Sequence, residues 1–137
     1  MVLAVPDNVL RATLHNVPIG QLMACMEQAL RHGHPVCWEG DITEPGFSFD
    51  RGVADLPQGS RRVDQARRQQ AFECRKTTDD HCMALVGLAH DAQGRRWFIA
   101  KNSWGTANPY GGYMYLSYEY VWMKTIAIYL SHEADYL

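Results

Sequence analysis

The pattern of apolar and polar residues in the middle of the chain predicts a β-hairpin. An apolar run at residues 83–89 and an aromatic-rich run at 97–100 flank residues 91–94, whose Asp and Gly supply turn chemistry. His81 opens the first expected strand, and Asn102 closes the second. Folding back at the turn therefore brings an imidazole and a carboxamide to one sheet edge, which is the geometry that a general base and its orienting partner need.

Hydrophobic spacing predicts one main helix ahead of this hairpin. Pro18 stands where a first helical turn begins, and apolar residues recur at helical spacing until Gly33 ends the run. These apolar residues are Ile19, Leu22, Met23, Met26, Ala29 and Leu30. Residues 1–17 hold scattered apolar side chains and turn formers, so we expect them to form an arm that leads into a domain at 18–137.

The other segments are expected to add strands. Residues 35–39, 113–117 and 125–130 are rich in the β-branched and aromatic side chains that favour strands. We expect a short helix at 64–72 and a helical or irregular crossing at 118–122. One helix followed by about five strands predicts an α+β domain built on a strongly bent antiparallel sheet.

Composition and charge narrow the classes of function. A hydrophobic content of 47% and a charged content of 20% over 137 residues are those of one globular domain rather than of a disordered chain. The formal net charge of −2 argues against a broad nucleic-acid surface. The one basic cluster, at residues 61–68, is interpreted as a solvated loop or helix face.

The sequence also indicates the cellular compartment of the protein. No apolar run approaches the ~18 residues that would span a bilayer, so no membrane partner is expected. The first residues lack the basic region of a signal peptide, although such a signal could have been lost with a missing N-terminal part. The four cysteines are scattered without CxxC pairs, and we interpret them as reduced, packed thiols that favour the cytoplasm, although they could also form two disulfides. No cofactor and no metal are expected.

Three short motifs resemble the His and Asn segments of papain-like cysteine peptidases. They are Asp-His at 80–81, Lys-Asn-Ser-Trp-Gly at 101–105 and Gly-Tyr at 112–113. A closer likeness is to bleomycin hydrolase and the bacterial aminopeptidase C group, and it rests on Thr-Thr-Asp-Asp-His at 77–81, Gly-Phe-Ser-Phe at 46–49 and the expected helix at 16–33. The likeness covers nearly all of this chain but only the C-terminal half of such an enzyme. It implies the right-hand, barrel-like antiparallel half of the papain-like fold, with one main helix and a peptide substrate.

The resemblance also implies roles for four residues. His81 would hold a thiolate as an ion pair and protonate the leaving amine, and Asn102 would fix the tautomer of His81. Trp104 would lie over their hydrogen bond and exclude water, the alternative being a plain core aromatic. Asp80 would tune the titration of the ion pair by its charge, or else it is a solvated turn acid.

The nucleophile is where the sequence departs from the family. The family pattern Gly-Ser/Thr-Cys-Trp, preceded by a Gln, does not occur in these 137 residues. Cys37 is followed by a tryptophan, but Pro-Val before it and Glu-Gly-Asp after it prevent a helix from starting at the sulfur. Cys25 is expected to be buried in the helix. Cys74 lies in an irregular stretch, and the sequence does not predict its position. Cys82 follows His81, and alternation along a strand predicts that Cys82 faces the core when His81 faces the cleft. No nucleophile is therefore assigned.

Two hypotheses of different class follow. In the first, the chain is the His/Asn half of a thiol aminopeptidase, and it works with a Cys-bearing N-terminal half that is truncated or separately encoded. In the second, the chain is a catalytically inactive remnant that serves as a binding or interaction module. A lone half of this fold would expose an apolar patch, so we expect homo-oligomers.

The last residues carry one more expectation. In bleomycin-hydrolase-like enzymes the C-terminal segment lies along the cleft, where its carboxylate can hold the free amino group of a substrate. The resemblance thus implies that residues 131–137 bring Leu137 within reach of His81, with Glu133 and Asp135 adding negative charge. The alternative is a short, frayed terminus without function.

Overall fold

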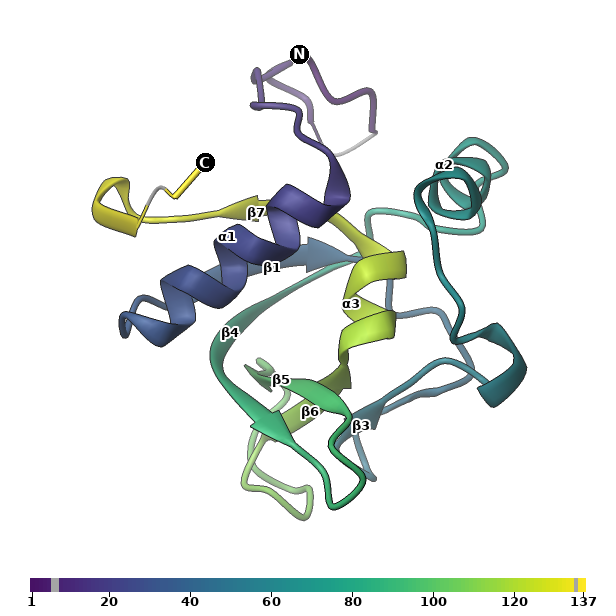
Figure 1. Ribbon diagram of the computed structural model, residues 1–137, viewed down its shortest axis with the longest axis vertical. Coiled ribbons are helices and arrows are strands. Elements are labelled where there is room, and N and C mark those ends of the chain that lie inside the picture. The colour runs from purple at the N-terminus through teal and green to yellow at the C-terminus, as the bar shows by residue number, and fades with distance from the viewer. Residues whose placement is uncertain (6–7, 135) are drawn as a thin grey trace.

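The computed structural model describes residues 1–5, 8–134 and 136–137, and its dominant feature is one strongly bent seven-stranded sheet. The strands are β1 (Val36–Gly40), β2 (Phe47–Ser48), β3 (Val53–Ala54), β4 (His81–His90), β5 (Arg96–Lys101), β6 (Tyr113–Ser117) and β7 (Thr125–Tyr129). Their order across the sheet is β2-β3-β6-β5-β4-β1-β7. Figure 1 shows β4 curving from the part of the sheet that holds β1 and β7 to the part that holds β5 and β6.

Helices cover this sheet. They are α1 (Ile19–Arg31), α2 (Gln65–Glu73) and α3 (Tyr118–Lys124), with two short 3₁₀ turns, η1 (Gln58–Ser60) and η2 (His132–Ala134). In Figure 1 α1 lies beside β1 and β7, and α3 crosses between the two parts of the sheet. Within the described residues, none of the helices is long and apolar enough to cross a bilayer. The predicted α+β class is confirmed.

The central hairpin forms where the pattern predicts it. β4 and β5 pair antiparallel, and the carboxylate of Asp91 accepts the backbone N–H groups of Gln93 at 3.0 Å and Arg95 at 2.9 Å. The same carboxylate accepts the indole N–H of Trp97 at 3.1 Å. Gly94 follows with φ of 80°, a left-handed conformation that favours glycine. The turn therefore fixes which residues of the two strands face each other.

The main helix also matches its prediction. Pro18 precedes its first residue, and Gly33, with φ of 83°, lies just beyond its end. Of the six apolar residues that were expected to share a face, all but the half-buried Leu22 are buried. Burial of that stripe against the sheet holds the helix in place.

Some elements were missed. The sequence predicted one main helix and a purely antiparallel sheet, whereas β3 and β6 pair parallel, with Val53 opposite Tyr115. A parallel pair needs a long crossover, and the chain from β3 to β6 supplies one because it includes α2 and the whole hairpin. β2 and β3 have two residues each, which is too short for an alternation to be recognised. The short helix at 64–72 was expected, and it begins after Asp64, whose carboxylate accepts the N–H of Arg67 at 2.8 Å.

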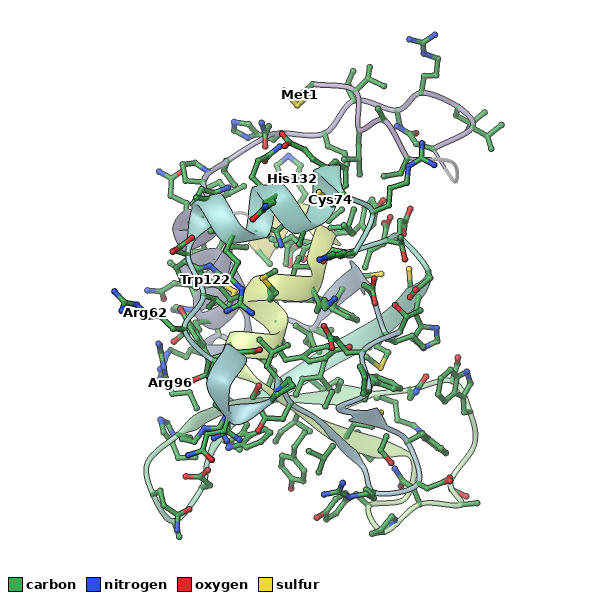
Figure 2. All side chains as sticks on the ribbon, turned by 90° about the vertical axis from the view of Figure 1, so that its right-hand side faces the viewer. Met1, Arg62, Cys74, Arg96, Trp122 and His132 are labelled. Carbon is green, nitrogen blue, oxygen red and sulfur yellow. The ribbon has the colours of Figure 1, made fainter. Side chains whose placement is uncertain are left out.

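The arginine-rich segment is less solvated than predicted. Arg62 projects outward (Figure 2), but Arg61 pairs with Asp55 at 2.7 Å. Arg68 turns inward, and its guanidinium donates to backbone carbonyl groups at the end of α3. Arg68 therefore joins α2 to the end of α3, and Arg61 ties the segment before α2 to Asp55.

A buried junction joins β1 to the end of α3. The indole N–H of Trp38 donates to Oγ1 of Thr125 at 2.7 Å, and that hydroxyl donates to the carbonyl oxygen of Val121 at 2.5 Å. Trp38 and Thr125 are both fully buried. Because an unpaired buried polar group costs free energy, this chain of hydrogen bonds lets a tryptophan fill the core without that cost.

Candidate active site

The hairpin brings His81 and Asn102 together, as the sequence predicts. His81 is the first residue of β4, and Asn102 directly follows Lys101, the last residue of β5. His81 Nε2 lies 2.9 Å from Asn102 Oδ1. The imidazole is half-buried, while the carboxamide is only 3% exposed.

The surroundings of Asn102 determine which ring nitrogen of His81 carries a proton. Asn102 Oδ1 also accepts the backbone N–H of Ser103 at 2.8 Å, and the amide nitrogen points at the sulfur of Met114 at 3.6 Å. Oδ1 is therefore the acceptor, and His81 Nε2 must be the donor. In the neutral ring this leaves a lone pair on Nδ1, the nitrogen that is directed away from Asn102.

Trp104 covers one side of the imidazole. Its ring centroid lies 4.9 Å from that of His81, at an interplanar angle of 40°. The indole also makes edge contacts with Phe47 at 5.9 Å and Phe49 at 5.5 Å. Trp104 is 46% exposed, so it is not a plain core aromatic. Its position agrees with the predicted cover over His81.

The loop after Asn102 is held tightly. The N–H of Asn102 donates to the carbonyl oxygen of Gly112 at 3.2 Å, and the N–H of Gly112 donates to Oδ1 of Asn108 at 2.7 Å. Gly112 has φ of 89°, and a Cβ there would collide with the carbonyl group of Gly105. This position therefore requires glycine, and the closed loop keeps Asn102 in place.

A second glycine lies opposite His81. Gly40 is the partner of His81 in the β1–β4 ladder. A Cβ at Gly40 would lie 2.5 Å from the carbonyl oxygen of Lys124 and would also collide with the ring of Trp38. The absence of a side chain lets β1 pass close to the start of β7 at the level of the imidazole.

Asp80 lies next to His81 but is tied to a different segment. Its exposed carboxylate accepts the N–H of Ile42 at 2.9 Å and the hydroxyl of Thr78 at 3.1 Å. These bonds join the segment before β4 to the loop after β1. An influence of Asp80 on the titration of His81 stays a prediction.

Asp41 is a supporting residue that the sequence analysis missed. Its fully buried carboxylate accepts the N–H of Thr43 at 2.7 Å and the N–H of Thr78 at 2.7 Å, and its backbone carbonyl accepts the hydroxyl of Tyr120 at 2.7 Å. Burial raises the pKa of Asp41, but the hydrogen bonds from Thr43 and Thr78 outweigh it, so the pKa lies below its usual value. The Asp-x-Thr spacing at 41–43 is a turn signal that could have indicated this residue.

The cysteines differ from the expectation of packed thiols. All four are free, and Cys25 is buried as predicted. Cys37, Cys74 and Cys82 are exposed instead. None of these three begins a helix, so none has the N-terminal helix position that lowers the pKa of a thiol.

Cys82 was expected to face the core, and this was wrong. It points away from His81, as alternation requires, but residues 81, 83 and 85 share the buried side of β4, so Cys82 lies on the outer side. Partial burial, the thiol of Cys37 and the carboxylate of Glu39 raise the pKa of Cys82 to about 11. A raised pKa disfavours the thiolate and thus a role as surrogate nucleophile.

A cavity of about 440 Å³ lies beside His81. Five residues of the N-terminal arm line it together with Glu39, Cys82 and Tyr129 from the sheet, and these five are Leu3, Val5, Asn8, Ala12 and Leu14. The hydroxyl of Tyr129 donates to Oε2 of Glu39 at 2.7 Å, and this bond together with burial raises the pKa of Tyr129 to about 12. The sequence could not indicate this pair, because its meeting depends on the register between β1 and β7. Across the described residues, no cluster of His, Cys, Asp or Glu is suited to hold a metal ion.

The C-terminal residues lie elsewhere than expected. Leu137 lines a different cavity, together with Leu130 and His132, and His81 is not among the residues that line it. The ring of Tyr136 stacks on that of His32 at 5.2 Å, beyond the end of α1. The expected reach of Leu137 to His81 is therefore wrong in this structure, and Asp135 lies outside the described residues.

The sequence comparison identifies the family. Residues 63–132, more than half of the chain, match the model of the papain family cysteine proteases. The chain belongs to this family. A comparison with curated proteins returned no match.

Solved structures show the same fold. PepW from Lactobacillus rhamnosis is 17% identical, with a TM-score of 0.69 over 88% of this chain and 28% of that one. Bromelain from Ananas comosus is 18% identical, with a TM-score of 0.51 over 80% of this chain and 45% of that one. The ragweed pollen allergen Amb a 11, in its proform, is 20% identical, with a TM-score of 0.52 over 79% of this chain and 29% of that one. The chain thus spans less than half of each of these proteins.

Proposed function

We propose that this chain supplies the His/Asn part of a cysteine-type aminopeptidase of the bleomycin hydrolase-like group, and that a Cys-bearing segment outside these 137 residues completes the site. The observation that carries the proposal is the bond between His81 Nε2 and Asn102 Oδ1, which leaves His81 Nδ1 to exchange a proton with a thiol. The absence of a Gly-Ser/Thr-Cys sequence in these residues is the reason for a second segment.

The proposed reaction follows from that arrangement. His81 Nδ1 takes the thiol proton, which gives a thiolate and an imidazolium. The thiolate attacks the carbonyl carbon of the peptide bond, and the proton on Nδ1 then passes to the leaving amine as the C–N bond breaks. Water hydrolyses the thioester that remains: Nδ1 takes a proton from this water and returns it to the sulfur as the acid is released. Throughout, Asn102 Oδ1 holds Nε2–H and so keeps the ring in one orientation.

Acidic side chains beside His81 support the choice of an aminopeptidase. Glu39, Asp79 and Asp80 line the cavity to which His81 also contributes. A carboxylate in a partly desolvated cavity pairs favourably with an ammonium group, such as the free amino end of a peptide. The substrate of this proposal is therefore a peptide with an unblocked N-terminus.

A second candidate function is a binding or interaction module without catalysis. The observation that favours it is the state of the chain's own thiols, since the pKa of Cys82 is raised and no cysteine begins a helix in the described residues. In this case the cavity beside His81 would hold a peptide end without cleaving it.

The test begins with the DNA upstream of the Met1 codon, read for an in-frame segment with Gln followed by Gly-Ser/Thr-Cys-Trp. We expect the 137-residue chain alone to be inactive on aminoacyl reporter substrates, and the chain joined to or mixed with that segment to be active. In the complete enzyme His81→Ala should lower kcat by about 10²-fold or more. His90→Ala is the matched control, because His90 is exposed at the other end of β4.

Two outcomes would contradict the peptidase proposal. One is a complete enzyme in which His81→Ala is as active as the unaltered protein. The other is turnover by the chain alone that disappears in Cys82→Ala or Cys37→Ala. If no upstream segment exists and a labelled peptide with a free N-terminus binds without cleavage, the binding module is the better description.

A further inference from the structure

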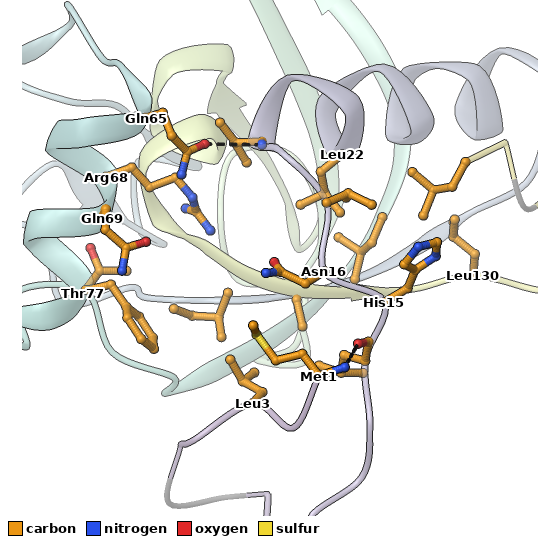
Figure 3. A pocket seen from close by; sticks show the side chains of 18 of the residues that line it. Met1, Leu3, His15, Asn16, Leu22, Gln65, Arg68, Gln69, Thr77 and Leu130 are labelled. Atoms are coloured by element: carbon orange, nitrogen blue, oxygen red, sulfur yellow. Dashed lines mark hydrogen bonds between the residues drawn. The ribbon is translucent and has the colours of Figure 1, made fainter.

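A second cavity lies away from His81, between the N-terminal arm, α1, α2 and β7 (Figure 3). Its volume is about 510 Å³, within the range of roughly 300–1,000 Å³ that small-molecule sites occupy. One part of its wall is aliphatic and aromatic. The residues of this part include Leu3, Leu14, Leu22, Phe72, Ile128 and Leu130.

A cation projects into this cavity. Figure 3 shows the side chain of Arg68 extending from α2 into the space, on the opposite side from Leu130. Its Nη1 donates to the carbonyl groups of Trp122 at 3.1 Å and Met123 at 3.2 Å, and its Nη2 donates to that of Thr125. No ion pair within the described part of the chain involves Arg68. A guanidinium has five N–H donors, so donors remain for an anion, and burial alone lowers the pKa of Arg68 to about 10.

A buried hydroxyl in the same wall lacks a partner. Thr77 is 3% exposed, it lines the cavity, and its Oγ1 makes no hydrogen bond in the structure. Buried polar atoms are nearly always paired, so an unpaired one at a cavity wall indicates a group that arrives from outside. A guanidinium and a hydroxyl together suit an acceptor with one negative charge.

We propose that this cavity binds a small apolar carboxylate. One carboxylate oxygen accepts from Arg68 and from the hydroxyl of Thr77, and the hydrocarbon part lies against Leu14, Leu22 and Ile128. The guanidinium of Arg68 can give charge-assisted hydrogen bonds to one carboxylate, and the apolar wall disfavours a strongly hydrated dianion such as phosphate. The site has no part in the proposed peptidase chemistry, so it is tested on the 137-residue chain without any activity assay.

The first experiment compares probes of equal chain length by isothermal titration calorimetry. We expect octanoate to bind at one saturable site, 1-octanol to bind at least tenfold more weakly, and octyltrimethylammonium not to bind. N-acetyl-leucyl-leucine distinguishes two sources of the carboxylate: a tighter fit for this peptide indicates a peptide C-terminus, and a tighter fit for octanoate indicates a fatty acid. Absence of binding by both carboxylates, or equal affinities for octanoate and 1-octanol, would overturn the proposal.

The second experiment assigns the binding to the two polar groups. Thr77→Val should weaken octanoate binding at least threefold without lowering Tm, because it removes only an unpaired hydroxyl. Arg68→Met should abolish the binding, whereas Arg67→Met should keep it, since Arg67 also donates to backbone carbonyl groups but does not line the cavity. If Arg68→Met does not fold, the probe series and Thr77→Val decide. Unchanged octanoate affinity in Thr77→Val places the ligand elsewhere and contradicts the proposal.

Discussion

At the candidate active site the carboxamide oxygen of Asn102 accepts two hydrogen bonds, and this restricts the orientation of the side chain. It accepts from His81 Nε2 and from the N–H of Ser103. A carboxylate at this place would accept the same bonds but would add a negative charge next to the imidazole. The neutral amide orients the ring without this change in charge.

This arrangement predicts unequal effects of two substitutions in the complete enzyme. Asn102→Ala leaves the imidazole in place but removes its preferred orientation, so kcat should fall by less than the factor of about 10² or more that is expected for His81→Ala. The measurement is kcat and KM on an aminoacyl reporter for both variants. A larger loss in Asn102→Ala than in His81→Ala would contradict the assigned roles.

Asp41 leads to a prediction about stability. Asp41→Asn should lower the free energy of unfolding by roughly 1.5–3 kcal/mol, because it weakens charge-assisted hydrogen bonds from Thr43 and Thr78. The pKa of Asp41 is lower in the folded state than in the unfolded state, so its contribution is fully present above the unfolded pKa and is lost as the pH falls through the folded pKa. Urea unfolding between pH 7 and pH 3 should therefore show a shallower loss of stability for Asp41→Asn than for the unaltered chain, and parallel curves would contradict the assignment.

The sequence predicts some contacts around the candidate active site but not others. His81 and Asn102 could be paired because a hairpin with a recognisable turn relates positions that are close in sequence. Asp41 and Thr78 meet across a separation of 37 residues, and Glu39 and Tyr129 across 90. No local pattern fixes such distances, because they depend on strand order and register.

At the scale of the elements, the junction between α3 and β7 depends on the buried hydroxyl of Thr125. Thr125 begins β7 and accepts the indole N–H of Trp38 from β1. β1 lies between β7 and β4, and its Gly40 is the ladder partner of Thr125 on one side and of His81 on the other. The packing of Trp38 therefore helps to hold the edge of the sheet that carries the imidazole.

This leads to a prediction at the junction of α3 and β7. Thr125→Val keeps the volume but leaves the buried indole N–H unpaired, so the free energy of unfolding should fall by roughly 1–3 kcal/mol. The exposed Thr106 gives the matched control, since Thr106→Val should change the value by less than about 0.5 kcal/mol. Chemical denaturation followed by tryptophan fluorescence measures both, and equal stabilities would show that the hydrogen bond to Trp38 contributes nothing.

Elements with a clear period were the ones that the sequence could predict. α1, β4, β5 and β6 each have an apolar stripe, an alternation or a turn that is readable within a few residues. α2 buries a single residue, Ala71, and was expected only from the polar, Arg- and Gln-rich composition of its segment. β2 and β3 gain their stability from neighbours rather than from their own two residues each, so only the assembled sheet reveals them.

At the scale of the whole molecule, half-exposed aromatic rings gather in the segment that follows Asn102. Trp104 is 46% exposed, Tyr110 44% and Tyr113 41%. All three belong to the loop and strand start that close the His81 edge. Large exposed apolar surfaces on soluble proteins mark interaction sites. We propose that the Cys-bearing segment packs against this face.

Without that segment, the chain should associate with itself through this face. We expect sedimentation velocity to show a dimer that dissociates on dilution, and Trp104→Arg to shift the equilibrium toward the monomer. Val86→Arg is the matched control, because Val86 is 44% exposed on the outer side of β4, away from His81. A strictly monomeric chain over a wide concentration range, or equal effects of the two substitutions, would contradict the prediction.

Gly40 has a consequence for genetic variation in this protein. Every single-base change that alters the amino acid encoded by a glycine codon adds a Cβ or ends the chain, and a Cβ at Gly40 collides with Trp38 and with the carbonyl group of Lys124. The position has no reactive atom and makes no contact with a substrate in the proposed mechanism. A mutational scan should nevertheless find it as intolerant as His81, so a loss-of-function allele at codon 40 would report on packing behind the imidazole rather than on chemistry.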